Sequence, residues 1–278
     1  MLLIADSGST KTHWCVIDEN GKKLIQTIGI NPYQMNNIAI KEVLDKELFP
    51  FLSPETIRNV HFYGAGCSTD QKCNLIDSVL QDFFVKANID VHHDMLGAAR
   101  ALCGHENGIA CILGTGCNSC YYDGTEITGQ ISSLGYILGD EGSGAYLGKR
   151  LIRDYYQDSM PADALLLFKQ EFNPVLEKIL DSIYNQPRPN RFLASFCPFI
   201  SKNINHPYFH ELVSSSFDEF FAKYVLKFDE AKTSKVHFLG SVAFYFSDIL
   251  KESAQKAGVQ IGKIYESPIQ GLVDFHVN

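Results

Sequence analysis

The sequence predicts an α/β protein built from two copies of one unit, in which three strands precede alternating helices and strands. An apolar strand that enters a turn of small polar residues occurs twice, at Leu2–Thr12 and again at Ile109–Ser119. Later in the two copies, Val60–Gly64 and Val236–Gly240 share four of five residues, and a helical pattern follows both. A duplication explains both observations. We therefore predict two lobes with a cleft between them.

The first copy follows from the spacing of its apolar residues. Strands are expected at Leu2–Ala5, Trp14–Ile17, Lys23–Ile28, Val60–Gly64 and Ile89–Asp94. Helices are expected over residues 38–49, 75–85 and 95–103. These elements form an N-terminal lobe that we assign to residues 1–107.

The second copy repeats this order and adds a large insert. Its strands are expected at Ile109–Leu113, Cys120–Tyr122, Glu126–Ile131 and Val236–Gly240. Residues 140–232 have a helical pattern and form the insert, in which Phe217, Phe220 and Phe221 are expected core residues. The C-terminal lobe is therefore assigned to residues 108–278.

The composition excludes several classes of protein. The chain has 278 residues, 45% hydrophobic and 20% charged, which is typical of a globular protein. Its net charge is −8 and it has no basic run, so we expect no nucleic-acid surface. No apolar segment reaches the ~20 residues of a membrane span, so no membrane is expected as a partner. Eight cysteines lack paired metal-ligand spacing, which favours reduced thiols and a cytoplasmic location.

The turn after the first strand, Asp6-Ser7-Gly8-Ser9-Thr10-Lys11-Thr12, has the composition of a phosphate-binding loop. Gly8 allows a ligand to approach the backbone, hydroxyl groups can donate to phosphate oxygens, and Lys11 adds a cation. Asp6 can hold a hydrated divalent cation beside the phosphates. The alternative is a solvated hairpin turn that is rich in Ser and Thr. A second turn of this type at Gly114–Ser119 favours phosphate binding.

These motifs together resemble the actin-like ATPase and sugar kinase superfamily, which implies duplicated ribonuclease H-like domains. The two turns resemble its first and second phosphate motifs, and Phe238–Ala243 resembles its adenosine motif. Gly135–Gly144, Gly114–Asn118 and Ser267–Val273 are similar to the N-acetylglucosamine kinase branch, in the BadF/BadG-type ATPase family. The resemblance extends from residue 2 to about residue 276.

The resemblance implies phosphoryl transfer from ATP, with Mg²⁺, to the primary hydroxyl of an amino sugar, foremost N-acetylglucosamine. Asp94 matches the catalytic aspartate, and Asp6 matches the acid on the magnesium side. Sugar contacts are implied for Asn31, Asn118 and Asp140, whose amide and carboxylate groups suit hydroxyl and acetamido groups. Nucleotide contacts are implied for Ser7, Gly8, Ser9, Thr10, Lys11, Gly114, Thr115, Gly116, Gly240, Ser241 and Val242. A homodimer is compatible with these partners.

Several alternatives remain open. Asp94 begins a helix, so a helix N-cap is its structural alternative. The protein could instead be an ATPase activator of an acyl-CoA dehydratase or reductase, which would need cluster-ligating cysteines, or a sugar sensor, which would not need Asp94. His92 and His93 are interpreted as structural, because neighbouring strand residues point to opposite faces. Cys117 and Cys120 are interpreted as small residues of the second turn.

Overall fold

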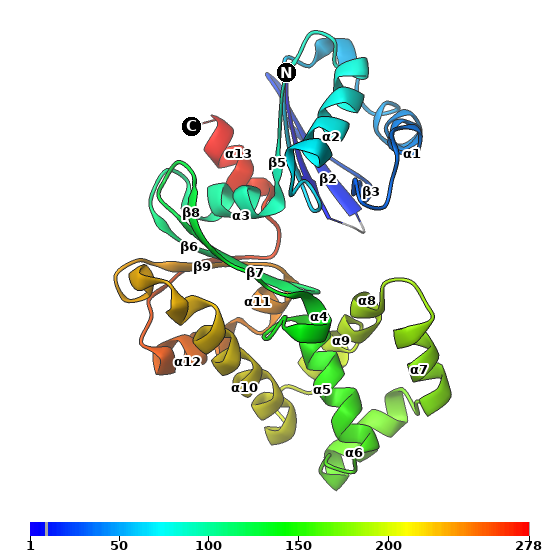
Figure 1. Ribbon diagram of the computed structural model, residues 1–278, viewed down its shortest axis with the longest axis vertical. Helices are drawn as coiled ribbons and strands as arrows, with labels where there is room; N and C mark the ends of the chain where they lie inside the picture. Colours follow the sequence, from blue (N-terminus) through cyan, green and yellow to red (C-terminus); the bar gives the residue numbers. More distant parts are fainter. Residues whose placement is uncertain (9–10, 278) are drawn as a thin grey trace. The chain divides into compact units, whose positions relative to one another are not determined.

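The computed structural model describes residues 1–8 and 11–277, which form two compact units (Figure 1). The first unit comprises Met1–Glu106 together with Pro268–Asn278, and the second comprises Asn107–Ser267. The C-terminal segment, which the sequence analysis assigned to the second lobe, thus makes its contacts within the first unit. Within the described ranges, no helix has both the length and the apolar character that crossing a membrane requires.

The first unit is a five-stranded mixed sheet with helices. Its strands are β1 (Leu2–Ser7), β2 (Lys11–Asp18), β3 (Gly21–Ile28), β4 (Asn59–Gly64) and β5 (Asn88–His93). Its helical elements are α1 (Asn37–Val43), the π-helix η1 (Leu44–Leu48), the 3₁₀ helix η2 (Pro54–Thr56), α2 (Asp70–Phe83), α3 (Asp94–Cys103) and α13 (Ile269–Val277). The strand order is β3-β2-β1-β4-β5, with β1 antiparallel to β2 and parallel to β4.

Both faces of this sheet are covered at β1, whose successive residues point to opposite faces. Leu3 and Ala5 pack in one cluster with residues of α1 and α2. Ile4 packs in a second cluster with residues of α3 and α13. Gly271 of α13 lies so close to α3 that a Cβ there would be 2.2 Å from the carbonyl oxygen of Ala101. This close packing is why the last helix belongs to the first unit.

The carboxyl ends of the three parallel strands are in register. Ser7 of β1 pairs with Gly64 of β4, which pairs with His93 of β5. The turn after β1 and the start of α3 at Asp94 therefore leave the same edge of the sheet. Ligands of open α/β sheets bind at this type of edge.

The second unit repeats the sheet and adds the insert. Its strands are β6 (Gly108–Leu113), β7 (Cys117–Tyr122), β8 (Ile127–Ile131), β9 (Val236–Leu239) and β10 (Ile261–Tyr265), in the order β10-β9-β6-β7-β8. Between β8 and β9 lie α4 (Gly135–Leu138), α5 (Gly144–Tyr156), α6 (Ala162–Glu171), α7 (Leu176–Tyr184), α8 (Pro189–Ala194), α9 (Cys197–Lys202), α10 (Pro207–Lys223) and the 3₁₀ helices η3 (Val225–Lys227) and η4 (Asp229–Lys232). The helices α11 (Ser241–Tyr245) and α12 (Ser247–Ala257) follow β9.

The two sheets have the same topology. β6 is antiparallel to β7 and parallel to β9, as β1 is to β2 and β4. This correspondence confirms the duplicated, two-lobed ribonuclease H-like fold that the sequence predicts.

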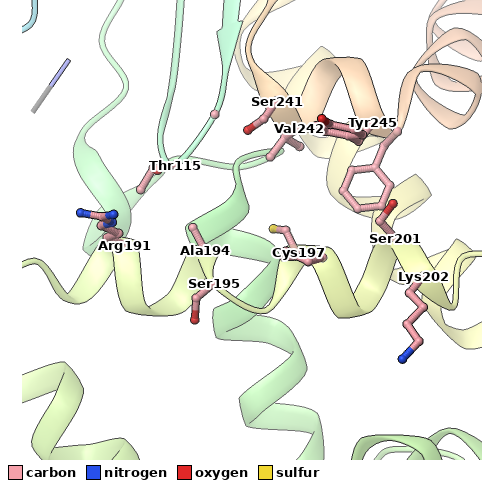
Figure 2. A pocket seen from close by; sticks show the side chains of 13 residues that line it. Thr115, Arg191, Ala194, Ser195, Cys197, Ser201, Lys202, Ser241, Val242 and Tyr245 are labelled. Atoms are coloured by element: carbon pink, nitrogen blue, oxygen red, sulfur yellow. The ribbon is translucent and has the colours of Figure 1, made fainter. Parts of the chain in front are cut away.

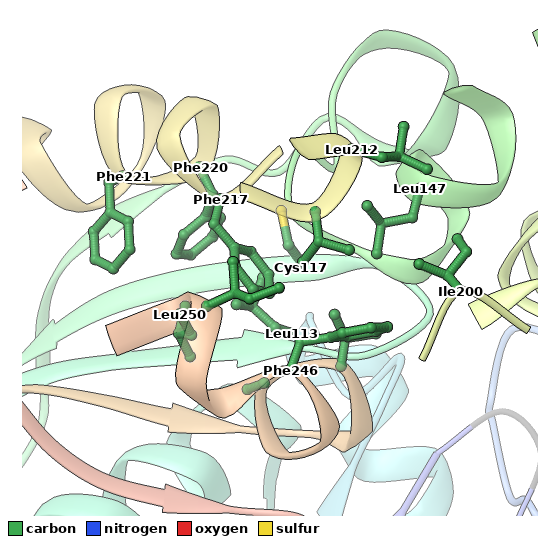
Figure 3. Close-up of a cluster of buried hydrophobic side chains, with 14 of the residues drawn as sticks. Leu113, Cys117, Leu147, Ile200, Leu212, Phe217, Phe220, Phe221, Phe246 and Leu250 are labelled. Carbon is green, nitrogen blue, oxygen red and sulfur yellow. The ribbon is translucent and has the colours of Figure 1, made fainter. Parts of the chain in front are cut away.

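The core of the second unit joins the insert to its sheet. Phe217, Phe220 and Phe221 of α10 are buried and belong to one cluster with Leu113 of β6 and Leu250 of α12 (Figure 3). The prediction that these phenylalanines are core residues is confirmed. Because the cluster includes Leu113, the insert packs directly against the strand that enters the second turn.

Candidate active site

The hydroxyl groups of the first turn stabilise the fold locally. Ser7 is fully buried, its Oγ lies 2.7 Å from Thr12 Oγ1, and it donates to the Ile30 carbonyl oxygen at 2.9 Å. The Ile30 amide in turn donates to Ser7 Oγ at 3.1 Å. This burial does not favour the predicted contact between the Ser7 hydroxyl and phosphate. The Gly8 amide donates to the Lys11 carbonyl oxygen and closes the hairpin. Ser9 and Thr10 lie outside the described residues.

Two carboxylates lie near the carboxyl edge of the first sheet. Asp6 is in β1, next to Ser7, and burial together with the negative charge of Asp94 raises its pKa to about 7, although Lys11 acts in the opposite direction. Burial also raises the pKa of Asp94, while His93 and backbone hydrogen bonds lower it. The structure therefore brings Asp6 and Asp94 close enough for their charges to interact.

The start of α3 explains how Asp94 is presented. His93 is the N-cap residue, and its Nδ1 accepts a hydrogen bond from the Met95 amide at 3.2 Å. Asp94 is the first residue inside the helix, so its carboxylate is not needed as the cap. The alternative interpretation of Asp94 as an N-cap is wrong. His93 has the structural function expected of it.

Asn31 lies in the loop after β3, on the first unit. It is 7% exposed, and its Oδ1 accepts a hydrogen bond from the Tyr33 amide at 2.9 Å. Gly66 lies against it with a φ of +88°, and a Cβ at Gly66 would be 2.5 Å from Asn31 Oδ1. Lys72 donates to the Pro32 carbonyl oxygen at 2.8 Å and lies over the Tyr33 ring at 4.5 Å. These contacts hold the loop around Asn31 in place.

The second turn, Gly114-Thr115-Gly116, is held by the first turn of α5. The amides of Gly144 and Ala145 donate to the carbonyl oxygens of Gly114 and Thr115, at 2.8 and 3.0 Å. Because these two amides at the N-terminus of α5 hydrogen-bond the turn, the turn and α5 form one rigid element.

Asp140 and Asn118 lie next to this turn. Asp140 is 5% exposed, has a φ of +60°, and its Oδ1 accepts from the Cys117 amide at 3.4 Å. A Cβ at Gly116 would be 3.0 Å from Asp140 Oδ2, which explains a glycine there. Burial raises the pKa of Asp140, and the Cys117 amide opposes this change. Asn118 Oδ1 accepts from Gln130 Nε2 at 3.3 Å.

A buried acid beside Asp140 could not be recognised in the sequence. Glu141 is 6% exposed and accepts hydrogen bonds from Lys223 Nζ and, at 2.8 Å, from the Tyr224 hydroxyl. Burial opposes ionisation of Glu141, but the hydrogen bonds from Lys223, a backbone amide and Tyr224, together with the charge of Lys223, lower its pKa overall. Both partners come from residues about eighty positions away in the chain, so no local pattern indicates this contact.

A cavity of about 700 Å³ in the second unit is lined in part by four of the residues predicted to contact the nucleotide (Figure 2). Gly114 and Thr115 of the second turn and Ser241 and Val242 of α11 all line it. The rest of the lining was not predicted from the sequence and comes chiefly from α8, α9 and the end of α11: Arg191, Ala194, Ser195, Cys197, Pro198, Ser201, Lys202, Tyr245 and Phe246. Burial raises the pKa of the Cys197 thiol to about 12, so this lining thiol is unreactive.

Gly240 allows the start of α11 to approach the second turn, and both segments line the cavity. Its φ is +119°, and a Cβ would be 2.4 Å from the Leu113 carbonyl oxygen. Only glycine tolerates both the left-handed backbone and this approach. The start of α11 can therefore lie directly against the end of β6, where the second turn begins.

Comparisons with solved structures agree with this geometry. A candidate N-acetylglucosamine kinase from Porphyromonas gingivalis is 44% identical to this chain, with a TM-score of 0.94 over 99% of this chain and 98% of that one. A candidate N-acetylglucosamine kinase from Chromobacterium violaceum is 17% identical, with a TM-score of 0.69 over 99% and 98% of the two chains. A candidate sugar kinase from Cytophaga hutchinsonii is 13% identical, with a TM-score of 0.54 over the full length of both.

The last two similarities concern the fold alone, whereas the first is close enough to establish a family. No family model and no curated protein sequence matches this chain. The duplicated sheets, the cavity beside the second turn and the 44% identity to the Porphyromonas gingivalis protein lead to one assignment. The chain is an ATP-dependent kinase that belongs to the sugar kinase family of that protein, with the actin-like ATPase fold.

Proposed function

We propose that this kinase phosphorylates N-acetylglucosamine at its primary hydroxyl, giving the 6-phosphate and ADP. The observation that carries the proposal is the 44% identity, over nearly the whole of both chains, to a protein described as a candidate kinase of this sugar. The side chains of Asn118 and Asp140, next to the second turn, offer an amide and a carboxylate, which can each bond to sugar hydroxyl groups.

The nucleotide is proposed to bind in the cavity of the second unit. A volume of about 700 Å³ is within the usual range of small-molecule sites. Gly114, Thr115 and Gly116 would hold the phosphates through their turn, and Gly240, Ser241 and Val242 would border the adenosine. On the first unit, Gly8 and Lys11 are proposed to contact the phosphates.

The carboxylates of the first unit suit a divalent cation. Burial and the charge of Asp94 raise the pKa of Asp6, so a cation at Asp6 would relieve unfavourable electrostatics. Carboxylate oxygens are among the ligands that Mg²⁺ prefers. The described residues contain no group of three or more His, Cys, Asp or Glu placed to bind a metal ion by themselves. One carboxylate is enough when phosphates and waters supply the other ligands. Bound Mg²⁺ would neutralise charge on the phosphates.

Asp94 is proposed as the catalytic base. Its carboxylate would accept the proton of the sugar's primary hydroxyl as that oxygen bonds to the γ-phosphorus. The bond from the γ-phosphorus to the bridging oxygen breaks, and ADP leaves. A raised pKa makes Asp94 a stronger proton acceptor than an exposed aspartate. Asn31, Asn118 and Asp140 are proposed to bind and orient the sugar.

The regiochemistry can be tested with 6-deoxy-N-acetylglucosamine, which lacks only the proposed acceptor hydroxyl. We expect it to compete with N-acetylglucosamine and to give no sugar phosphate, while the parent sugar gives a product whose phosphorus couples to the C6 protons in NMR spectra. A phosphorylated product from the 6-deoxy sugar would contradict the proposed acceptor position.

A further inference from the structure

We propose that Arg191, on helix α8 of the insert, binds the phosphate chain of the nucleotide in the cavity of the second unit. This inference rests on the proposed function, because it takes ATP as the occupant of that cavity. In Figure 2, Arg191 and Thr115 lie toward one end of the cavity, and Tyr245 lies toward the other. The second turn marks the phosphate end, so Arg191 is at the end where negative charge is expected.

Arg191 is available for a ligand, whereas the other cation that lines the cavity is already paired. Lys202 Nζ lies 2.9 Å from Glu171 Oε2, an ion pair within the insert. Arg191 is exposed, and no hydrogen bond or ion pair joins its guanidinium to any residue that the structure describes. No acidic side chain is among the described residues that line the cavity. The net charge of this lining is therefore positive.

The packing of α8 fixes where Arg191 is held relative to the turn. Gly148 of α5 lies so close to α8 that a Cβ would be 1.9 Å from the Leu193 carbonyl oxygen. The first amides of α5 bind the carbonyl oxygens of Gly114 and Thr115. Helix α5 thus connects the second turn and α8 into one body. An arginine held in this way can bind phosphate oxygens through its planar fork of N–H donors.

The test is calorimetric titration of the purified full-length chain with a non-hydrolysable ATP analogue, ADP and adenosine. For Arg191→Ala we expect the affinity for the analogue to fall about 10- to 100-fold, the usual effect of losing hydrogen bonds to a charged group. Adenosine affinity should not change, because it has no phosphate. Arg191→Lys should give an intermediate loss, since it keeps the charge without the fork. Lys169→Ala, which removes an exposed cation of α6 outside the cavity lining, is the matched control and should bind all three ligands as the wild-type protein does.

The outcomes separate this inference from the proposed function. If wild-type protein binds the analogue and Arg191→Ala binds it equally well, the assignment of Arg191 is wrong and the nucleotide site stands. An equal loss of adenosine affinity in Arg191→Ala would also overturn the inference, because the residue would then shape the pocket or contact the nucleoside. If the wild-type protein binds neither the ATP analogue nor ADP, the proposed function itself is overturned.

Discussion

Asp94 is the residue on which we expect phosphoryl transfer to depend most strongly. Asp94→Asn keeps the shape of the side chain but removes the proton acceptor, a change that typically costs roughly 10²- to 10⁴-fold in rate. Steady-state kinetics should show this loss in kcat, while calorimetry shows normal nucleotide binding. Asp90→Asn, in the strand that leads to Asp94, is the control and should retain turnover. Near wild-type turnover by Asp94→Asn would exclude it as the base.

Asp140 is expected to act on the sugar rather than on the nucleotide. Asp140→Asn keeps a residue type that tolerates the φ of +60° but removes the charge that would accept from sugar hydroxyl groups. We expect a higher KM for the sugar, by the equivalent of about 1–3 kcal/mol for a lost partner, with a much smaller change for ATP. Asn118→Ala should behave likewise, and Asn185→Ala, at the exposed C-cap of α7, should not. An equal rise of both KM values would indicate phosphate contacts instead.

For single residues, the sequence predicts the site residues that belong to short motifs. It does not predict those whose position depends on packing between distant segments of the chain. Gly114, Thr115, Ser241 and Val242 could be predicted because each belongs to a short motif, and they do line one cavity. Arg191 belongs to no motif, and only the packing of α8 brings it to the cavity. The burial of Ser7 depends on Ile30, more than twenty residues away, so the turn composition alone overstated the role of its hydroxyl.

Among the elements, α5 connects the second turn to α8, and Gly148 makes the contact with α8 possible. Gly148→Ala should destabilise the protein by about 1–3 kcal/mol, because the added methyl group has no space against Leu193, even though alanine favours helices. It should also raise the KM for ATP, since α8 lines the cavity. Chemical denaturation and kinetics would measure both effects. Gly129→Ala is the control, because its Cβ would make only ordinary contacts at 3.6 Å.

Helix α13 should make stability depend on pH. Burial, together with the charges of His61, Arg100 and His92, lowers the pKa of His276 to about 3, while Asp90 faces His61 at 3.1 Å. The unfolded chain binds a proton near the ordinary value of 6.5 and the folded chain does not. The free energy of unfolding should therefore fall as the pH decreases from 6.5 towards 3. The neutral ring also hydrogen-bonds the Tyr63 hydroxyl at 2.8 Å.

The contribution of His276 can be isolated by substitution. In His276→Phe the ring remains but cannot be protonated, so the free energy of unfolding should depend less steeply on pH over this window. Urea denaturation at several pH values would measure the slope. An unchanged slope would show that other groups cause the pH dependence.

Element boundaries differ from the predictions where side chains rather than periodicity decide them. The helix predicted over residues 75–85 begins at Asp70, because the Thr69 side chain caps it by accepting from the Lys72 amide. The helix predicted over residues 38–49 is present but becomes a π-helix at Leu44. Apolar periodicity does not predict this change, since Leu44 and Leu48 are four residues apart, as on one face of an α-helix, and both are buried in the π-helix.

For the whole molecule, internal duplication made the fold predictable. Two copies of one strand pattern, each with a polar turn, allow only a few topologies. The two sheets have equivalent strand orders, as a duplication predicts. The path of the last helix could not be predicted, because its apolar residues suit either sheet, and its contacts with α3 and β1 select the first unit. The preferred sugar likewise depends on hydrogen-bond geometry that no single motif specifies.

The central claim is that this kinase acts on N-acetylglucosamine. Its most direct test is ADP release by the purified protein with ATP and Mg²⁺, measured separately with N-acetylglucosamine, glucosamine, N-acetylmuramic acid and glucose, and without sugar. We predict negligible release without sugar and the highest kcat/KM with N-acetylglucosamine. ADP release that does not depend on any sugar, or a higher kcat/KM for another sugar in the panel, would contradict the account.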